Sequence, residues 1–147
     1  MAPLILLVIL VVVFWLAGRA GIALFQDPSF VLRAALGFMF LFTASAHWGR
    51  RRPDLIRMVP PQLPHPHLLV TVTGILEILG AIGLFVPRTA RAASICLALL
   101  LLALFPANIR AARQNLTIGG QHVLSWPIRG AIQLVFIATL IAAAWLQ

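Results

Sequence analysis

The chain has very few acidic residues, no lysine and a single cysteine. Asp27, Asp54 and Glu77 are its only carboxylates, and all eleven of its cations are arginines. Because Cys96 stands alone, neither an intramolecular disulfide nor a C-x-x-C dithiol relay can form. Only 10% of the 147 residues are charged, 62% are hydrophobic, and the mean hydropathy of +1.04 leaves too little polar surface for a soluble globule. The composition predicts one small, all-α integral membrane domain.

Apolar runs along the chain predict five membrane-spanning helices. The first, Pro3 to Phe25, has neither a basic leader nor a good cleavage site, although a cleaved signal peptide is the alternative. Residues 1–26 thus form an N-terminal transmembrane helix or signal anchor, and residues 27–147 form a four-helix membrane domain. Asp27-Pro28-Ser29 predicts the cap and first turn of a second helix that reaches Trp48. The other three are expected at Leu68 to Val86, Thr89 to about Ile109, and Ile128 to Leu146.

Polar connections separate these runs. Gly49 to Pro66 begins with three arginines and continues with a short amphipathic piece, DLIRMV (54–59). It ends with prolines at 60, 61, 64 and 66, which exclude a helix there and favour an extended, polyproline-like cover over the membrane surface. Val86 to Thr89 predicts a tight turn with Thr89 as the helix cap. Pro106 should kink the fourth helix, and Gln114 to Pro127 is a second polar connection.

The arginines are divided unequally between the two sides of this topology. The side of the N-terminus carries Arg50, Arg51, Arg52, Arg57, Arg110, Arg113 and Arg129. The opposite side carries Arg19, Arg33, Arg88 and Arg91. By the positive-inside rule, this excess predicts that the N-terminus and the proline-rich loop lie in the cytoplasm. The expected location is a bacterial inner (plasma) membrane. A nucleic-acid partner is excluded, because the net charge of +8 comes with no basic stripe or binding module.

Glu77 is the only glutamate, and it lies inside an otherwise apolar run. Counted from His67 it lies about 15 Å along the helix, near the membrane midplane, where an ionised carboxylate costs at least ~2.5 kcal/mol. Thr73, Gly80 and Ala81 at i−4, i+3 and i+4 make its face small and polar, so we expect it to meet a neighbouring helix. We expect Glu77 to be neutral or to share a proton. A brace that only locks helices together is the alternative to a functional site.

Several polar residues fall in the half of the membrane toward which Glu77 opens. Gln133 has nearly the depth of Glu77, and Arg129, one turn nearer the surface, is a candidate counter-charge. We therefore predict a polar cavity that opens on the proline-rich side and is closed below by Leu and Phe. Its expected pocket residues are Glu77, His47, Thr73, Asn108, Arg129 and Gln133.

The histidines do not predict a metal site. His65 and His67 form a weak pair among prolines, and neither His47 nor His122 is joined by a second cysteine or a carboxylate cluster. Haem would need two facing histidines at matched depth on different helices, which the spacing does not offer. No cofactor motif, dithiol, or nucleophile with its base identifies a catalytic residue.

Four ordered blocks resemble the DoxX-like membrane proteins, a family of four-helix bundles. They are GFMFLFTASAHW (37–48), MVPPQLPHP (58–66), TGILEILGAIGLFVP (73–87) and FPANI (105–109), and the resemblance covers about Ser29 to Gln147. It implies that Glu77 belongs to the signature G-x-x-E-x-x-G-x-x-G-L and that His47 matches the polar end of the family's first helix. The implied family positions are Gly74, Gly80, Gly83 and Pro106. The implied fold is a DoxX-like four-helix transmembrane bundle with an additional N-terminal hydrophobic helix.

The resemblance leaves three functional hypotheses. The family name comes from a subunit of a thiosulfate:quinone oxidoreductase, and relatives are described in oxidative-stress complexes and as receptor-assembly chaperones. The favoured hypothesis is a non-catalytic subunit or assembly partner with a polar pocket around Glu77. The alternatives are a quinone-linked oxidoreductase subunit and a small-molecule or lipid carrier. No covalent cofactor is expected, and a quinone is a candidate ligand. Membrane lipids, a membrane or redox protein and a second copy of the chain are the expected partners.

Overall fold

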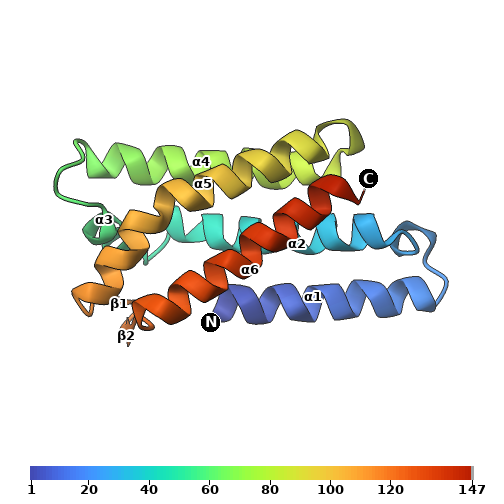
Figure 1. Ribbon diagram of the computed structural model, residues 1–147, viewed down its shortest axis with the longest axis horizontal. Helices are drawn as coiled ribbons and strands as arrows, with labels where there is room; N and C mark the ends of the chain where they lie inside the picture. The colour runs from blue at the N-terminus through green and yellow to red at the C-terminus, as the bar shows by residue number, and fades with distance from the viewer. Residues whose placement is uncertain (147) are drawn as a thin grey trace.

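The computed structural model describes residues 1–146, and this part is almost entirely helical (Figure 1). Five helices in it are long and apolar enough to cross a membrane, which is consistent with a multi-pass membrane protein. They are α1 (Ala2–Arg19), α2 (Pro28–Ala44), α4 (Pro66–Phe85), α5 (Pro87–Arg113) and α6 (Trp126–Trp145). The predicted all-helical class and the predicted set of apolar helices are therefore confirmed.

Four of these helices close into a ring. In order around it, α2 packs on α4, α4 on α5 and α5 on α6, and a smaller contact between α6 and α2 completes the circuit. The core inside the ring includes Leu36, Met39, Leu84, Leu97 and Leu140, each less than 2% exposed. Helix α1 runs alongside α2, with Leu7 as its one buried residue (Figure 1). It therefore lies against the ring rather than inside it.

The first two helices end earlier than the apolar pattern predicts. Helix α1 stops at Arg19, because Gly21 has a φ of 98° that turns the chain, and Ala23–Phe25 forms a separate 3₁₀ turn. The predicted cap of α2 is confirmed, since Asp27 accepts hydrogen bonds from the Ser29 amide at 2.9 Å and from its hydroxyl at 2.7 Å.

The proline-rich part of the segment from Gly49 to Pro66 forms a turn rather than an extended cover, so that part of the prediction is wrong, whereas the prolines at 60, 61 and 64 lie outside any helix as predicted. A short helix α3 (Arg52–Met58) occupies the first half of the segment, because Pro53 stands in the first turn, where a missing amide costs no hydrogen bond. A turn follows, with Leu63 N donating to Pro60 O at 3.0 Å. Pro66 belongs to α4 as its first residue.

The connections around α5 also differ from prediction. Thr89 is the third residue of α5 rather than its cap, and its hydroxyl donates to Gly83 O at 2.9 Å at the end of α4. Helix α5 continues past Pro106 to Arg113, beyond the expected Ile109. The polar connection that follows forms a hairpin of β1 (Thr117–Ile118) and β2 (Gln121–His122).

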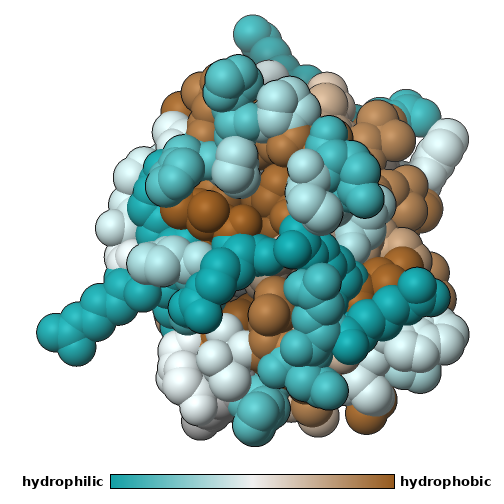
Figure 2. Space-filling model, turned by 90° about the vertical axis from the view of Figure 1, so that its left-hand side faces the viewer, coloured by the Kyte–Doolittle hydropathy of each residue, from teal (hydrophilic) through white to brown (hydrophobic). Residues whose placement is uncertain are grey.

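The hairpin turns through two glycines. Gly119 and Gly120 have φ angles of 59° and 80°, which suit a two-residue turn. The hairpin, α3 and the proline-rich loop gather at one end of the ring, on the left in Figure 1, which we call the loop end. Figure 2 looks onto that end and shows hydrophilic side chains around apolar atoms that remain visible between them.

Candidate functional site

A cavity of about 690 Å³ lies at the loop end, and every membrane helix contributes to its wall. Most lining residues are apolar, including Met39 and Phe40 from α2, Leu101 from α5 and Phe136 from α6. The first residues of α1 and the proline-rich loop also contribute. The cavity brings together all of the predicted pocket residues, namely Glu77, His47, Thr73, Asn108, Arg129 and Gln133.

Glu77 reaches the cavity from the middle of α4. Its side chain is 6% exposed, and Oε2 accepts a hydrogen bond of 3.0 Å from the hydroxyl of Thr43 on α2. The Thr43 hydroxyl also lies 2.9 Å from its own helix carbonyl at Phe40, so it is shared between two acceptors. This contact joins α2 to α4 and leaves the carboxyl group on the cavity wall. That Glu77 is neutral or shares a proton stays a prediction.

A second polar cluster joins α5 to α6. Arg129 Nη2 donates to Asn108 Oδ1, Asn108 Nδ2 donates to Gln133 Oε1 at 3.1 Å, and Gln133 Nε2 donates to Leu101 O at 2.7 Å. These bonds form a continuous chain, which we call the α5–α6 relay. Pro106 lies within this stretch of α5 and lacks an amide, so the Leu102 carbonyl four residues before it has no regular helical donor.

The two polar clusters lie on opposite sides of the ring. The ring order of α2, α4, α5 and α6 sets the α2–α4 seam across from the α5–α6 seam. Within residues 1–146 no ion pair joins Glu77 to Arg129, so the proposed counter-charge contact is not formed. The helix order keeps the two residues on different seams, and Asn108 on the facing turn of α5 accepts a hydrogen bond from the Arg129 guanidinium.

His47 and Thr73 complete the predicted set. His47 is 7% exposed in the 3₁₀ turn after α2, and its Nδ1 lies 3.2 Å from Ala44 O. Gly74 permits this packing, since an added Cβ would lie 2.7 Å from the His47 ring. The Thr73 hydroxyl bonds the carbonyls of its own helix, at 2.9 Å to Leu69 O. Thr73 therefore lines the cavity without crossing it.

The other glycines of the Glu77 signature are helix contacts. A Cβ at Gly80 would lie 2.5 Å from Leu97, and one at Gly83 would lie 2.8 Å from Ala93, so both let α5 approach α4 closely. Pro106 differs from them, because it lines the cavity directly.

The predicted pocket set left out three polar residues that line the cavity, Thr43, Arg51 and His122. Thr43 stands four residues before His47, so helical spacing could have placed it on the same face. Arg51 belongs to a run of three arginines that no spacing rule distinguishes. Its neighbour Arg52 has another role, donating to His47 O at 2.6 Å and to the Thr71 hydroxyl at 2.9 Å, which ties the start of α4 to the end of α2.

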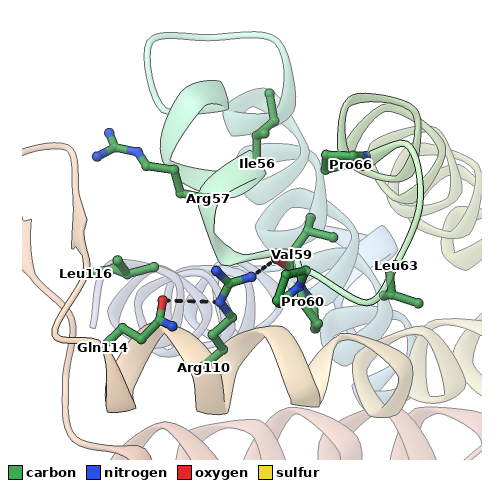
Figure 3. A pocket seen from close by; sticks show the side chains of 10 residues that line it. Ile56, Arg57, Val59, Pro60, Leu63, Pro66, Arg110, Gln114 and Leu116 are labelled. Atoms are coloured by element: carbon green, nitrogen blue, oxygen red, sulfur yellow. Dashed lines mark hydrogen bonds between the residues drawn. The ribbon is translucent and has the colours of Figure 1, made fainter.

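A second groove, of about 470 Å³, lies beside the proline-rich loop (Figure 3). Arg110 crosses it, donating through Nη1 to Val59 O and through Nε to Gln114 Oε1 at 3.2 Å. Arg110 thus attaches the loop to the end of α5 and supports the rim of the cavity. In the described part of the chain, no group of three or more His, Cys, Asp or Glu is placed to hold a metal ion.

The fold places the chain among all-helical proteins that have several helices able to cross a membrane. Residues 36–147 match the family model described as Domain of unknown function (DUF8561), so the chain belongs to that family. The matched region starts within α2 and includes both polar clusters of the cavity. No curated protein and no solved structure matches the chain.

Proposed function

We propose that this protein is a non-catalytic membrane protein whose cavity binds a small amphipathic molecule. One observation carries the proposal, namely a cavity of about 690 Å³ in which apolar walls meet two hydrogen-bonded polar clusters. Sites for small molecules commonly measure ~300–1,000 Å³, with mainly apolar walls and a few polar groups that orient the ligand. This combination supports a lipid or small-molecule binding role, either for the protein alone or as a subunit of a larger complex.

The proposed setting is a bacterial inner membrane with the loop end in the cytoplasm. The arginine excess at the loop end supports that orientation. The outer faces of the helices expose large apolar side chains such as Leu79, Leu99 and Leu134, each at least 59% exposed, which suit contact with lipid tails. The four sequence blocks support a DoxX-like bundle as part of the same proposal.

A quinone-linked subunit is the second candidate. The observation that favours it is the position of hydrogen-bonding groups on opposite sides of the ring, with Glu77 on one seam and the α5–α6 relay on the other. A quinone head group carries an oxygen at each end, so each oxygen would find a hydrogen-bonding side chain on its side of the cavity. In this role another polypeptide supplies the electrons.

Mass spectrometry of lipids extracted from gently purified protein tests the proposal. Ala107→Trp fills the cavity, because Ala107 lines it on α5. Ala138→Trp is the matched control, since Ala138 is exposed on α6 and is not among the lining residues. We expect a molecule retained in stoichiometric amount by wild type and the control and absent from Ala107→Trp. Equal lipid profiles for all three proteins would refute the proposal, and a retained quinone would select the second candidate.

A further inference from the structure

The charges on the cavity wall are not balanced. Arg51 and Arg129 both line the cavity near the loop end, whereas Glu77 is the one carboxylate among the lining residues and bonds to Thr43. Neither arginine has an acidic partner within residues 1–146. The ion pairs found there are Arg33–Asp27 and Arg57–Asp54. The protein thus presents two guanidinium groups to the cavity that no side chain neutralises.

Arg129 is held in place and still has a free donor. Its Nη2 donates to Asn108 Oδ1, and the α5–α6 relay fixes Asn108 in turn through Gln133. Its Nε is buried and has no hydrogen-bond partner among the residues that the structure describes. A guanidinium binds an oxyanion through a fork of N–H groups, and holding it beforehand lowers the entropy lost on binding. Because Arg129 lines the cavity and has no acidic partner within residues 1–146, an anionic oxygen in the cavity would supply the counter-charge that its guanidinium lacks.

The rest of the cavity determines the shape of the ligand. At the level of Gln133 and beyond it, away from the loop end, Leu101, Met39 and Phe136 contribute apolar wall that suits a hydrocarbon chain. Glu77 stands on the other seam and carries no positive charge, so the arginines at the loop end are the cationic side chains of the wall. Both effects orient an amphiphile with its charged head at the loop end and its tail in the bundle.

Resting on the proposed function, we infer that the cavity binds a single-chain amphiphile with an anionic oxygen head, such as a long-chain carboxylate. The head lies at Arg129 and Arg51, and the chain lies along Met39 and Phe136. Arg129 is the residue that selects the head, because the relay holds it on the cavity wall and no acidic side chain within residues 1–146 pairs with it. The apolar wall contributes equally to the binding of a long-chain acid and of its neutral ester, so a difference in affinity between the two reports on the head group.

Radiolabelled palmitate and methyl palmitate binding to the full chain in phosphatidylcholine nanodiscs tests this inference. Charge-assisted hydrogen bonds are typically worth tenfold or more in affinity, so palmitate should bind the wild type about 10- to 100-fold more tightly than the ester. Arg129→Gln should remove that preference by weakening palmitate alone. Arg113→Gln is the matched control, because Arg113 is an exposed arginine at the loop end of α5. This variant should change the affinity for neither palmitate nor methyl palmitate.

Several outcomes would overturn the inference. Equal binding of acid and ester by the wild type would do so, as would equal losses in Arg113→Gln and Arg129→Gln, which would indicate a general surface charge effect. Competition by millimolar inorganic phosphate would assign the site to a free anion. If Arg129→Gln fails to fold, Arg129→Lys replaces it. An unchanged preference for palmitate over the ester in Arg129→Lys would contradict recognition of the head by the forked N–H groups of the guanidinium.

Failure of this inference is distinguishable from failure of the proposed function. If Ala107→Trp abolishes binding of both probes while Arg129→Gln alters neither, the cavity is a binding site and only the assignment of its head group is wrong. If neither probe binds and no lipid is retained by wild type over Ala107→Trp, the proposed function itself fails.

Discussion

Replacing Glu77 with leucine tests whether this carboxyl group braces the bundle. The side chain is 6% exposed, and its hydrogen bond within residues 1–146 comes from Thr43 Oγ1 at 3.0 Å. Because that hydroxyl is also 2.9 Å from Phe40 O, it keeps an acceptor after the substitution. The variant therefore avoids the ~1–3 kcal/mol cost of stranding a buried polar group, and it removes a polar group from an apolar site. We expect the free energy of unfolding to equal that of wild type or to rise.

Gln133→Leu is the matched contrast, because Gln133 is also 6% exposed but stands in the middle of the α5–α6 relay. Its loss leaves Asn108 Nδ2 without its acceptor and removes the bond of 2.7 Å to Leu101 O. We expect the free energy of unfolding to fall by ~1–3 kcal/mol. Tryptophan fluorescence during unfolding in one detergent compares the two variants with wild type.

The result that would refute this reasoning is a loss of ~1 kcal/mol or more in Glu77→Leu, similar to that in Gln133→Leu. Glu77→Gln then serves as the check, since it keeps the shape of the side chain and an acceptor for Thr43. Wild-type stability in Glu77→Gln together with a large loss in Glu77→Leu would mean that the carboxyl group is a structural brace.

Two further predictions concern a helix contact and a helix cap. Gly83→Ala places a methyl group 2.8 Å from Ala93 Cβ and should lower the free energy of unfolding by ~1–3 kcal/mol. At Gly130 an added Cβ would lie 3.7 Å from its nearest neighbour, so Gly130→Ala should leave the free energy of unfolding unchanged or raise it by up to ~1 kcal/mol. Equal melting temperatures for the Gly83→Ala and Gly130→Ala variants would contradict the close contact at Gly83. Hydrogen bonds from the Ser29 hydroxyl and amide hold the pKa of Asp27 below its ordinary value of 3.8, so its ionised form stabilises the fold above that pH and loses this effect as the pH falls through the lowered pKa. The melting temperatures of wild type and Asp27→Asn should therefore converge in acid, and a gap that stays constant down to about pH 2 would disprove the link.

The long apolar helices were predictable because length and hydropathy determine them. Thr89 and Pro66 were misplaced for the same physical reason, since proline and threonine are tolerated both just before a helix and inside its first turn. Helix α3 covers most of the amphipathic piece DLIRMV (54–59), but the pattern of so short a stretch could not show that it is helical. The hairpin was predictable in principle, as Gly119-Gly120 is a typical two-residue turn between short strands.

The depth of each residue along its helix was enough to predict most of the polar residues that line the cavity. It was not enough to predict which of them contact one another. Depth placed Glu77, Gln133 and Arg129 in the same half of the membrane. It could not show which of them touch, because contact depends on the order of the helices around the ring. Asn108 therefore took the position beside Arg129 that had been expected for Glu77.

Photoaffinity labelling with a diazirine-bearing single-chain lipid tests the central claim, that the cavity between the two polar clusters is a binding site. The sites of attachment are mapped by mass spectrometry of the digested protein, with and without excess unlabelled lipid. We expect competable adducts on lining residues such as Met39, Leu101 and Phe136, and we expect Ala107→Trp to lose them. Adducts that lie only on outward-facing residues such as Leu99 and Leu134, and that excess unlabelled lipid does not reduce, would contradict the claim.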